Sequence, residues 1–321
     1  MMPTLESASP LATGEPWPLL DDLAYLCTVM VNVYFVGPRH AADRQWVLID
    51  TGMPGSADRI ARAAEARFGP GSRPLAIILT HGHFDHVGAL EALARCWDAP
   101  IYAHTMELRY LTGRSSYPPP DPFVGGGLIA TLSWTYPWGP INLGDRVKPL
   151  PEDGSVPGLP GWRWIFTPGH TPGHVALFRD ADRTLIAGDA FVTTKQESAL
   201  AVMTQRQELH GPPMYFTPDW ESAARSVAAL ADLDPEIAAT GHGEPLHGGS
   251  MRADLHNLAR DFHRRAVPQQ GRYVNRPAEA DENGVLNIPP DVPHNLPNLL
   301  VGVGEIAALM KEFLGKHLAK I

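Results

Sequence analysis

The residues of this sequence that are best suited to chemistry stand in one short run, His81-Gly82-His83-Phe84-Asp85-His86. His81 and His83 are two positions apart, so in an extended chain their side chains point the same way and can bind one metal ion. Asp85 and His86 are adjacent and diverge, so they can serve a second metal ion nearby. Because neutral imidazole and carboxylate are ligands that suit zinc, iron and manganese, the run predicts a metal site.

Three further segments carry a histidine or an aspartate just beyond a predicted strand. They hold His170 within residues 167–174, Asp189 after Gly188, and His242 between two glycines. The small neighbouring residues allow the backbone to approach a ligand closely. Each segment alone is a weak signal, but together with the run 81–86 they predict one shared site.

Short strands and helices must position these segments. Apolar patterns predict strands over residues 28–36, 46–50, 75–80, 100–103, 162–166, 175–178, 184–187 and 237–240. Helices are predicted over residues 56–68, 87–97, 219–233 and 251–265, the third with Thr217-Pro218 as its cap and first residue. Since strands and helices alternate, the body is α/β or α+β rather than of one type.

Changes in composition along the chain predict three parts. Residues 1–24 form an irregular N-terminal arm, residues 25–267 the catalytic domain, and residues 268–321 a proline-rich tail ending in an amphipathic helix over 305–318. The apolar stripe of that helix predicts packing on the same chain or on a second copy, as in a homodimer. Residues 109–143 are too irregular for a regular element and too aromatic for a disordered linker.

Charge and composition disfavour two classes of partner, nucleic acids and membranes. The sequence has 26 Lys and Arg against 35 Asp and Glu, a net charge of -9, which disfavours binding of nucleic acid through its phosphates. No apolar run approaches the roughly 18 residues of a membrane span. Residues 1–20 lack the pattern of a signal peptide, and the two cysteines suit a reducing compartment. We therefore expect a cytoplasmic protein with a small-molecule substrate and without a nucleic-acid or membrane partner.

In their order along the chain, these motifs resemble the metallo-β-lactamase superfamily of hydrolases. The resemblance covers about residues 28–246 and rests on a strand-end Asp50, the run 81–86, the segment 167–174, Asp189 and His242. It implies a four-layer αββα sandwich of the α+β class with metals at one edge, to which the C-terminal helix would add an extension.

The resemblance also implies roles for individual residues. It implies seven metal ligands, with His81, His83 and His170 on the first metal, Asp85, His86 and His242 on the second, and Asp189 bridging both. Asp50 would orient the ligand loop through hydrogen bonds. His174 would contact the substrate or support a ligand.

Such a site permits hydrolysis. We expect two Zn²⁺ ions, with iron or manganese as alternatives, to hold a bridging hydroxide that attacks an ester, lactone or thioester of a small, partly hydrophobic substrate. Asp85 would be the catalytic residue that takes up a proton and returns it to the leaving group. Trp134, Tyr136 and Trp138 would line the substrate pocket, because mostly apolar linings are typical of small-molecule sites.

Departures from subfamily patterns narrow the choice of reaction. True β-lactamases usually have Cys or Ser in place of Asp189, and di-iron flavoproteins have an acidic ligand in place of His83. Residues 190–195 lack the Cys-Gly-Arg stretch of glyoxalase II-like enzymes, and Val192 stands where homoserine lactone lactonases keep a Tyr. An acidic chain is also unlike the RNA-processing nucleases. The alternative to a hydrolase is a mononuclear iron sulfur dioxygenase of the same fold.

Overall fold

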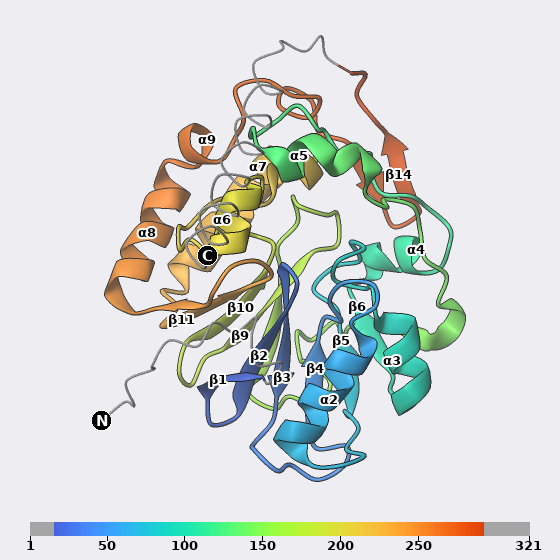
Figure 1. The fold of residues 1–321 in the computed structure, drawn as a ribbon. Coiled ribbons are helices and arrows are strands. Elements are labelled where there is room, and N and C mark those ends of the chain that lie inside the picture. Colours follow the sequence, from blue (N-terminus) through green and yellow to red (C-terminus); the bar gives the residue numbers. More distant parts are fainter. Residues whose placement is uncertain (1–15, 292–321) are drawn as a thin grey trace, which may run out of the picture.

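The computed structural model describes residues 16–291. Two β-sheets pack face to face, and helices cover the outer face of each sheet, as Figure 1 shows. The predicted αββα sandwich of the α+β class is therefore confirmed. The predicted helix over residues 305–318 lies outside the described residues, so the C-terminal extension and a homodimer through it stay predictions.

The first sheet has seven strands. In spatial order they are β1 (Trp17–Leu20), β2 (Leu23–Thr28), β3 (Val31–Val36), β4 (Val47–Ile49), β5 (Ala76–Ile78), β6 (Ile101–Ala103) and β7 (Val147–Pro149). Strands β1 to β4 pair antiparallel and β4 to β7 pair parallel. Helices α2 (Ala57–Phe68) and α3 (Leu90–Trp97) cover its outer face.

The second sheet has five strands. In spatial order they are β12 (Leu246–His247), β11 (Ile237–Thr240), β10 (Thr184–Gly188), β9 (Val175–Arg179) and β8 (Trp162–Phe166). Only β10 and β11 pair parallel. Its outer face carries the helices α7 (Trp220–Asp232), α8 (Gly248–Arg260) and α9 (Phe262–Arg265). The predicted cap of α7 at Thr217 is wrong, because Asp219 accepts the backbone N–H of Ser222 at 3.0 Å.

The alternation of side chains along the strands builds three separate cores. Phe35 of β3 packs under α2 and α3, whereas its neighbour Tyr34 lies between the sheets. In the second sheet, Leu185 of β10 packs under α7 and α8, whereas Ile186 faces the first sheet. Because each sheet is buried on both faces, the strand ends from which the ligand loops leave are held rigidly.

The predicted strand over residues 28–36 is wrong at its beginning. β2 ends at Thr28, β3 begins at Val31, and the two residues between them form a hairpin turn in which Val29 has φ 72°. Val29, Val31 and Val33 continue the alternation of a strand across the turn, so the periodicity could not reveal it.

Two predicted irregular regions contain strands. Residues 17–24 are not an irregular arm, because β1 pairs antiparallel with β2; Pro18 is tolerated there because β1 is an edge strand. In the tail, the hairpin of β13 (Glu279–Asp281) and β14 (Gly284–Asn287) lies between Pro277 and Pro289. The division of the chain at residues 25 and 267 stays a prediction.

The long connection between β6 and β7 is also more regular than predicted. It contains α4 (Leu108–Leu111) and α5 (Leu128–Leu132), and a further short helix, α6 (Ala199–Thr204), follows β10. In Figure 1, α4, α5 and β14 lie beyond one end of the sandwich. These segments therefore surround the end of the sheets where the ligand loops emerge.

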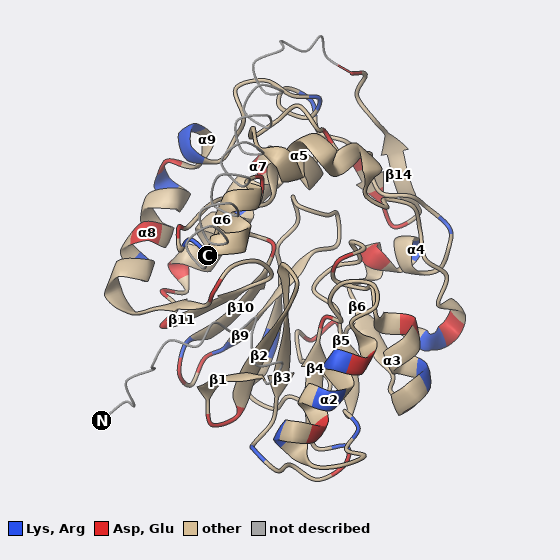
Figure 2. Ribbon diagram, in the orientation of Figure 1, with Lys and Arg blue, Asp and Glu red and all other residues tan. Residues whose placement is uncertain are grey.

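Charged residues of both signs are mixed on the outer helices. Figure 2 shows Lys and Arg interspersed with Asp and Glu along α2, α3 and α8. Within residues 16–291, none of the helices combines the length and the apolar character that crossing a membrane requires.

Candidate metal centre

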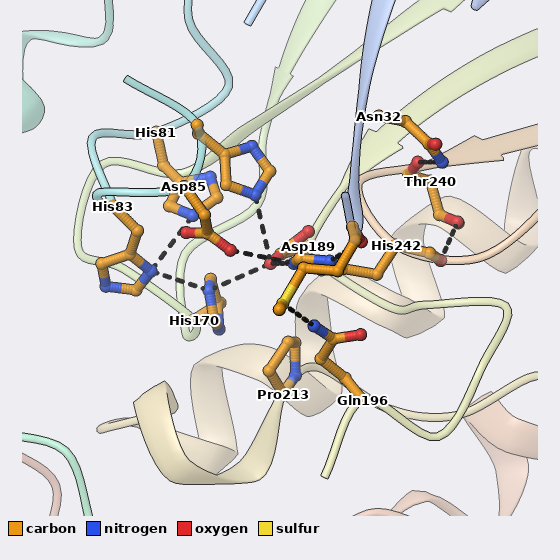
Figure 3. A network of polar contacts seen from close by, with 12 residues as sticks. Asn32, His81, His83, Asp85, His170, Asp189, Gln196, Pro213, Thr240 and His242 are labelled. Atoms are coloured by element: carbon orange, nitrogen blue, oxygen red, sulfur yellow. Dashed lines mark hydrogen bonds and ion pairs between the residues drawn. The ribbon is translucent and has the colours of Figure 1, made fainter. Parts of the chain in front are cut away.

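The seven candidate ligands lie on loops that leave strand ends at one edge of the sandwich. The run from His81 to His86 follows β5, and His170 lies on the loop from β8 to β9. Asp189 and His242 follow β10 and β11, which are parallel neighbours. Because adjacent parallel strands end at the same edge, their loops converge there, as Figure 3 shows.

Three histidines form the first group. Nδ1 of His83 lies 3.1 Å from Nε2 of His81 and 3.0 Å from Nε2 of His170. All three side chains are buried, and their ligand atoms lie within 4.8 Å of one another. The structure therefore brings together the residues predicted to hold the first metal.

Asp85, His86 and His242 form the second group, and Asp189 lies between the two groups. Nε2 of His242 is 3.4 Å from Oδ2 of Asp85 and 3.1 Å from Oδ2 of Asp189. The same Asp189 oxygen is 3.5 Å from Nε2 of His86 and 3.4 Å from Nε2 of His170 in the first group. One carboxylate oxygen thus reaches histidines of both groups.

Hydrogen bonds outside the centre fix which ring nitrogen faces it. Nδ1 of His242 lies 2.7 Å from the carbonyl oxygen of Met30, which can only accept, so Nδ1 carries the hydrogen. Nδ1 of His86 lies 2.8 Å from Oδ2 of Asp50 and donates in the same way. Both rings therefore turn Nε2 toward the centre, and Nε2 is the atom through which they would bind a metal.

The same reasoning applies to the first group. The hydroxyl of Thr217 donates to a carbonyl at 2.7 Å, so it accepts from Nδ1 of His170 at 3.2 Å. The hydroxyl of Thr80 donates to Asp50 at 2.7 Å, so it accepts from Nδ1 of His81 at 3.1 Å. His170 and His81 therefore direct Nε2 lone pairs inward.

Burial keeps the first group in the neutral form that metals need. It lowers the pKa of His81 and His170 well below the ordinary histidine value, and that of His83 to about 3. Neighbouring histidines act in the same direction, because two imidazolium charges repel each other.

The second group attracts a cation. Burial lowers the pKa of His86, but the carboxylates of Asp189 and Asp50 outweigh it and raise that pKa well above its ordinary value. Burial raises the pKa of Asp189, yet His242 and His86 hold it well below its usual range. Nε2 of His86 and Oδ1 of Asp189 are buried without a hydrogen-bond partner. Buried polar atoms normally have a partner, and a divalent metal ion would supply one here, because such ions bind histidine nitrogen and carboxylate oxygen.

The two predicted supporting residues contact the ligands from outside. Asp50 accepts from the backbone N–H of Thr80 at 2.8 Å in addition to contacting His86. Nε2 of His174 accepts the backbone N–H of Asp189 at 2.9 Å, and its Nδ1 lies 2.8 Å from the hydroxyl of Thr167. Both ring nitrogens of His174 are thus engaged within the protein and support a ligand loop.

The three predicted pocket aromatics are separated in the structure. Tyr136 is half-buried, with its ring centroid 5.5 Å from that of Phe84 in the ligand run. Trp134 is 68% exposed, and with Trp138 it lines a depression of about 320 Å³ whose lining includes none of the seven candidate ligands. The structure therefore brings Tyr136, but neither tryptophan, to the candidate centre.

Several residues of the centre carried no sequence signal. The ring of Phe216 stacks on His83 with centroids 4.6 Å apart. Gln196 is fully buried; its Nε2 lies 3.5 Å from Sδ of Met30, and its Oε1 has no partner (Figure 3). Glu107 is fully buried and bonds to two ligand loops. Each of these residues lies outside the motifs in sequence, and a single buried aromatic, amide or carboxylate forms no local pattern.

Comparison with known proteins finds relatives that are named as hydrolases. The chain is 52% identical over 234 residues to the probable metallo-hydrolase YflN of Bacillus subtilis, covering 73% of this chain and 88% of the relative. It is 28% identical over 137 residues to a hydroxyacylglutathione hydrolase of Methylobacillus flagellatus, covering 42% of this chain and 40% of that protein.

A solved structure and a family model agree with these relatives. A beta-lactamase domain protein from Burkholderia ambifaria has the same fold, with a TM-score of 0.53, 19% identity, and coverage of 79% of this chain and 78% of that one. The family model described as the metallo-beta-lactamase superfamily matches residues 28–242, which span all seven candidate ligands. The chain therefore belongs to the metallo-β-lactamase superfamily and is a metal-dependent hydrolase.

Proposed function

We propose that this hydrolase holds two metal ions and cleaves an ester, lactone or thioester bond in a small, partly hydrophobic substrate. The observation that carries the proposal is the position of Oδ2 of Asp189, 3.1 Å from Nε2 of His242 and 3.4 Å from Nε2 of His170. One carboxylate oxygen within reach of both ligand groups suits two cations a few ångströms apart.

Two cations bound in these groups would lower the pKa of a coordinated water and polarise the substrate carbonyl. Asp85 is placed to move the proton. Its Oδ2 lies 3.4 Å from Nε2 of His242, and burial raises its pKa, although the nearby histidines oppose this effect. A carboxylate whose pKa is raised holds a proton more readily and can return it to the leaving group.

An aromatic wall beside the first group supports a hydrophobic acyl part. Phe216 stacks on His83, and the Tyr136 ring lies 5.5 Å from Phe84 and 6.4 Å from Phe216. Burial raises the pKa of Tyr136 to about 12, so its hydroxyl stays protonated at neutral pH and can donate to a substrate oxygen. We therefore assign the pocket wall to Tyr136, Phe84 and Phe216 rather than to Trp134 and Trp138.

Metal analysis joined to a substrate panel tests the proposal. We expect two metal ions per chain, zinc above iron or manganese, and turnover of lactones, thioesters or aryl esters. The partial likeness to a hydroxyacylglutathione hydrolase is a reason to include acylated glutathione in the panel. Asp189→Asn should lose metal and turnover, whereas Asp180→Asn, an exposed aspartate paired with Arg163, should keep both.

Two other results would contradict the proposal. Turnover of phosphodiesters alone would exclude the acyl substrates. One iron ion per chain, with oxygen uptake on a persulfide substrate, would instead favour the sulfur dioxygenase alternative.

A further inference from the structure

Glu107 is a carboxylate without exposed surface that the proposed reaction does not use. It lies in the short helical turn Thr105–Glu107 that follows β6, directly before α4. No candidate ligand precedes or follows it closely in sequence. A buried acidic side chain is rare unless its charge is compensated, so its surroundings require an explanation.

The carboxylate of Glu107 joins the two loops that supply the first ligand group. Oε2 accepts the backbone N–H of Gly82 at 2.9 Å, and Gly82 stands between His81 and His83. Oε1 accepts the hydroxyl of Thr171 at 2.7 Å, and Thr171 directly follows a ligand histidine.

Two further donors complete the shell. The backbone N–H of Gly173 donates to Oε1 at 2.8 Å, and the hydroxyl of Tyr117 donates to Oε2. Each carboxylate oxygen of Glu107 thus accepts two hydrogen bonds.

Both loops are shaped to fit Glu107. A Cβ atom on Gly82 would lie 2.5 Å from the hydroxyl oxygen of Tyr117 and 3.4 Å from Oε2 of Glu107. A Cβ atom on Gly173 would lie 2.7 Å from the backbone nitrogen of Glu107 and 2.8 Å from its Oε1. These glycines of the two motifs therefore give Glu107 the close approach that its hydrogen bonds need.

The hydrogen-bond pattern requires an ionised carboxylate. Burial raises the pKa of Glu107 above its ordinary value, and the hydrogen bonds from Tyr117, Thr171, Gly173 and Gly82 oppose this effect by favouring the charged form. A proton on either oxygen would displace one of the four donors. Because all four partners are neutral, none of them neutralises the charge, and a cation between His81, His83 and His170 would lie just beyond Gly82.

We propose that Glu107 is a positioning residue that holds the His81–His83 segment and the His170 loop at the spacing the first metal requires. The inference rests on the three-histidine site of the proposed function, but not on the substrate or on the reaction. Loss of the Glu107 carboxylate should weaken the first metal site and leave the Asp85–His86–His242 site unchanged.

Binding of Co²⁺ to the metal-free protein, followed by absorbance and by equilibrium dialysis, tests the inference. His170→Ala and His242→Ala identify the signals lost with the first and the second site. In Glu107→Gln the amide cannot accept from all four donors, so we expect the affinity of the first site to fall about 10–100-fold, the usual effect of losing an outer-shell partner. The second site should bind Co²⁺ as in the wild type.

Glu197→Gln is the matched control. Glu197 is also a buried glutamate, but its carboxylate accepts the backbone N–H of Met214 at 2.8 Å instead of a group in a ligand loop. This variant should leave both Co²⁺ affinities unchanged. Three results would overturn the inference. The first site could bind Co²⁺ with wild-type affinity in Glu107→Gln, both sites could weaken equally, or Glu197→Gln could lose as much affinity at the first site.

Milder variants keep the test decisive if Glu107→Gln does not fold. Tyr117→Phe and Thr171→Val each remove one donor and retain the carboxylate. Each should weaken the first site selectively and by less than Glu107→Gln would, and wild-type Co²⁺ affinity in both would refute the inference. Hydrolysis of no substrate in the panel would contradict the proposed function but would leave these binding results standing.

Discussion

Oδ2 of Asp50 lies 2.8 Å from Nδ1 of His86 and also accepts the hydroxyl of Thr80 at 2.7 Å. Thr80 directly precedes His81, so one carboxylate fixes both the ring of a second-group ligand and the start of the loop that carries the first group. Asp50 itself has φ 57°, a left-handed conformation that Asp and Asn tolerate better than most residues.

Replacing Asp50 with Asn should weaken the second metal site. Asn tolerates the left-handed backbone, but its single oxygen cannot accept from His86 and from both donors of Thr80. We expect the affinity for the second Zn²⁺ to fall about 10–100-fold, measured by competition with a chromophoric chelator. Asp58→Asn, at an exposed position of α2, is the control, and equal affinities in the two variants would exclude the assigned role.

Replacing Asp85 with Asn tests whether this residue moves a proton in addition to binding the second metal. Turnover should fall about 10²–10⁴-fold, the range for lost acid–base catalysis, because an amide cannot carry the proton. The first metal should remain, since His81, His83 and His170 are unchanged. Steady-state kinetics with metal analysis of the same sample measures both. Near-normal turnover with two metals bound would leave Asp85 as a ligand only.

The sequence could predict which side chains gather at this centre, because all seven candidate ligands lie on segments that directly follow four strands. The run 81–86 follows a continuous apolar strand of the first sheet, and His170, Asp189 and His242 follow three strands of the second sheet. The packing of the two sheets brings these strand ends to one edge. The residue patterns predict only an α/β or α+β body, and the layers of the sandwich are expected from the resemblance of the motifs to the family.

The supporting contacts could not be predicted, for identifiable physical reasons. His242 is oriented by the backbone carbonyl of Met30, and a carbonyl has no residue type to recognise. Met30 reaches that place because the chain turns at Val29, where apolar alternation masks the hairpin. Glu107 is a single glutamate in a turn, and only the folded chain shows that two ligand loops meet at it.

His174 should make the metal-free protein sensitive to acid. It is buried and neutral, and burial lowers its pKa from 6.5 to about 4. As the pH falls from 6.5 towards 4, the unfolded chain binds a proton at this residue before the folded chain does. The free energy of unfolding therefore falls through this window, by at most about 1.4 kcal/mol per pH unit from this residue.

The variant His174→Gln removes that titration and retains an acceptor for the N–H of Asp189. We expect it to be less stable than the wild type at pH 7.5, with the difference in free energy of unfolding narrowing as the pH is lowered to 5. Urea denaturation of both metal-free proteins across this range measures it. A difference that stays constant with pH would show that His174 does not carry the effect.

Tyr136 should determine how well a hydrophobic acyl group binds. Its ring packs on Phe84 beside the ligand run, and burying an aromatic ring contributes about 1.5–3 kcal/mol, which corresponds to tenfold or more in affinity. Tyr136→Ala should therefore raise KM for long-chain acyl substrates about tenfold or more and affect short-chain substrates less. Tyr136→Phe separates the ring from the hydroxyl and should retain the chain-length preference.

Trp134→Ala and Trp138→Ala are matched aromatic controls, because both tryptophans line the separate depression. If KM rises in the tryptophan variants and stays at the wild-type value in Tyr136→Ala, the substrate pocket is that depression instead.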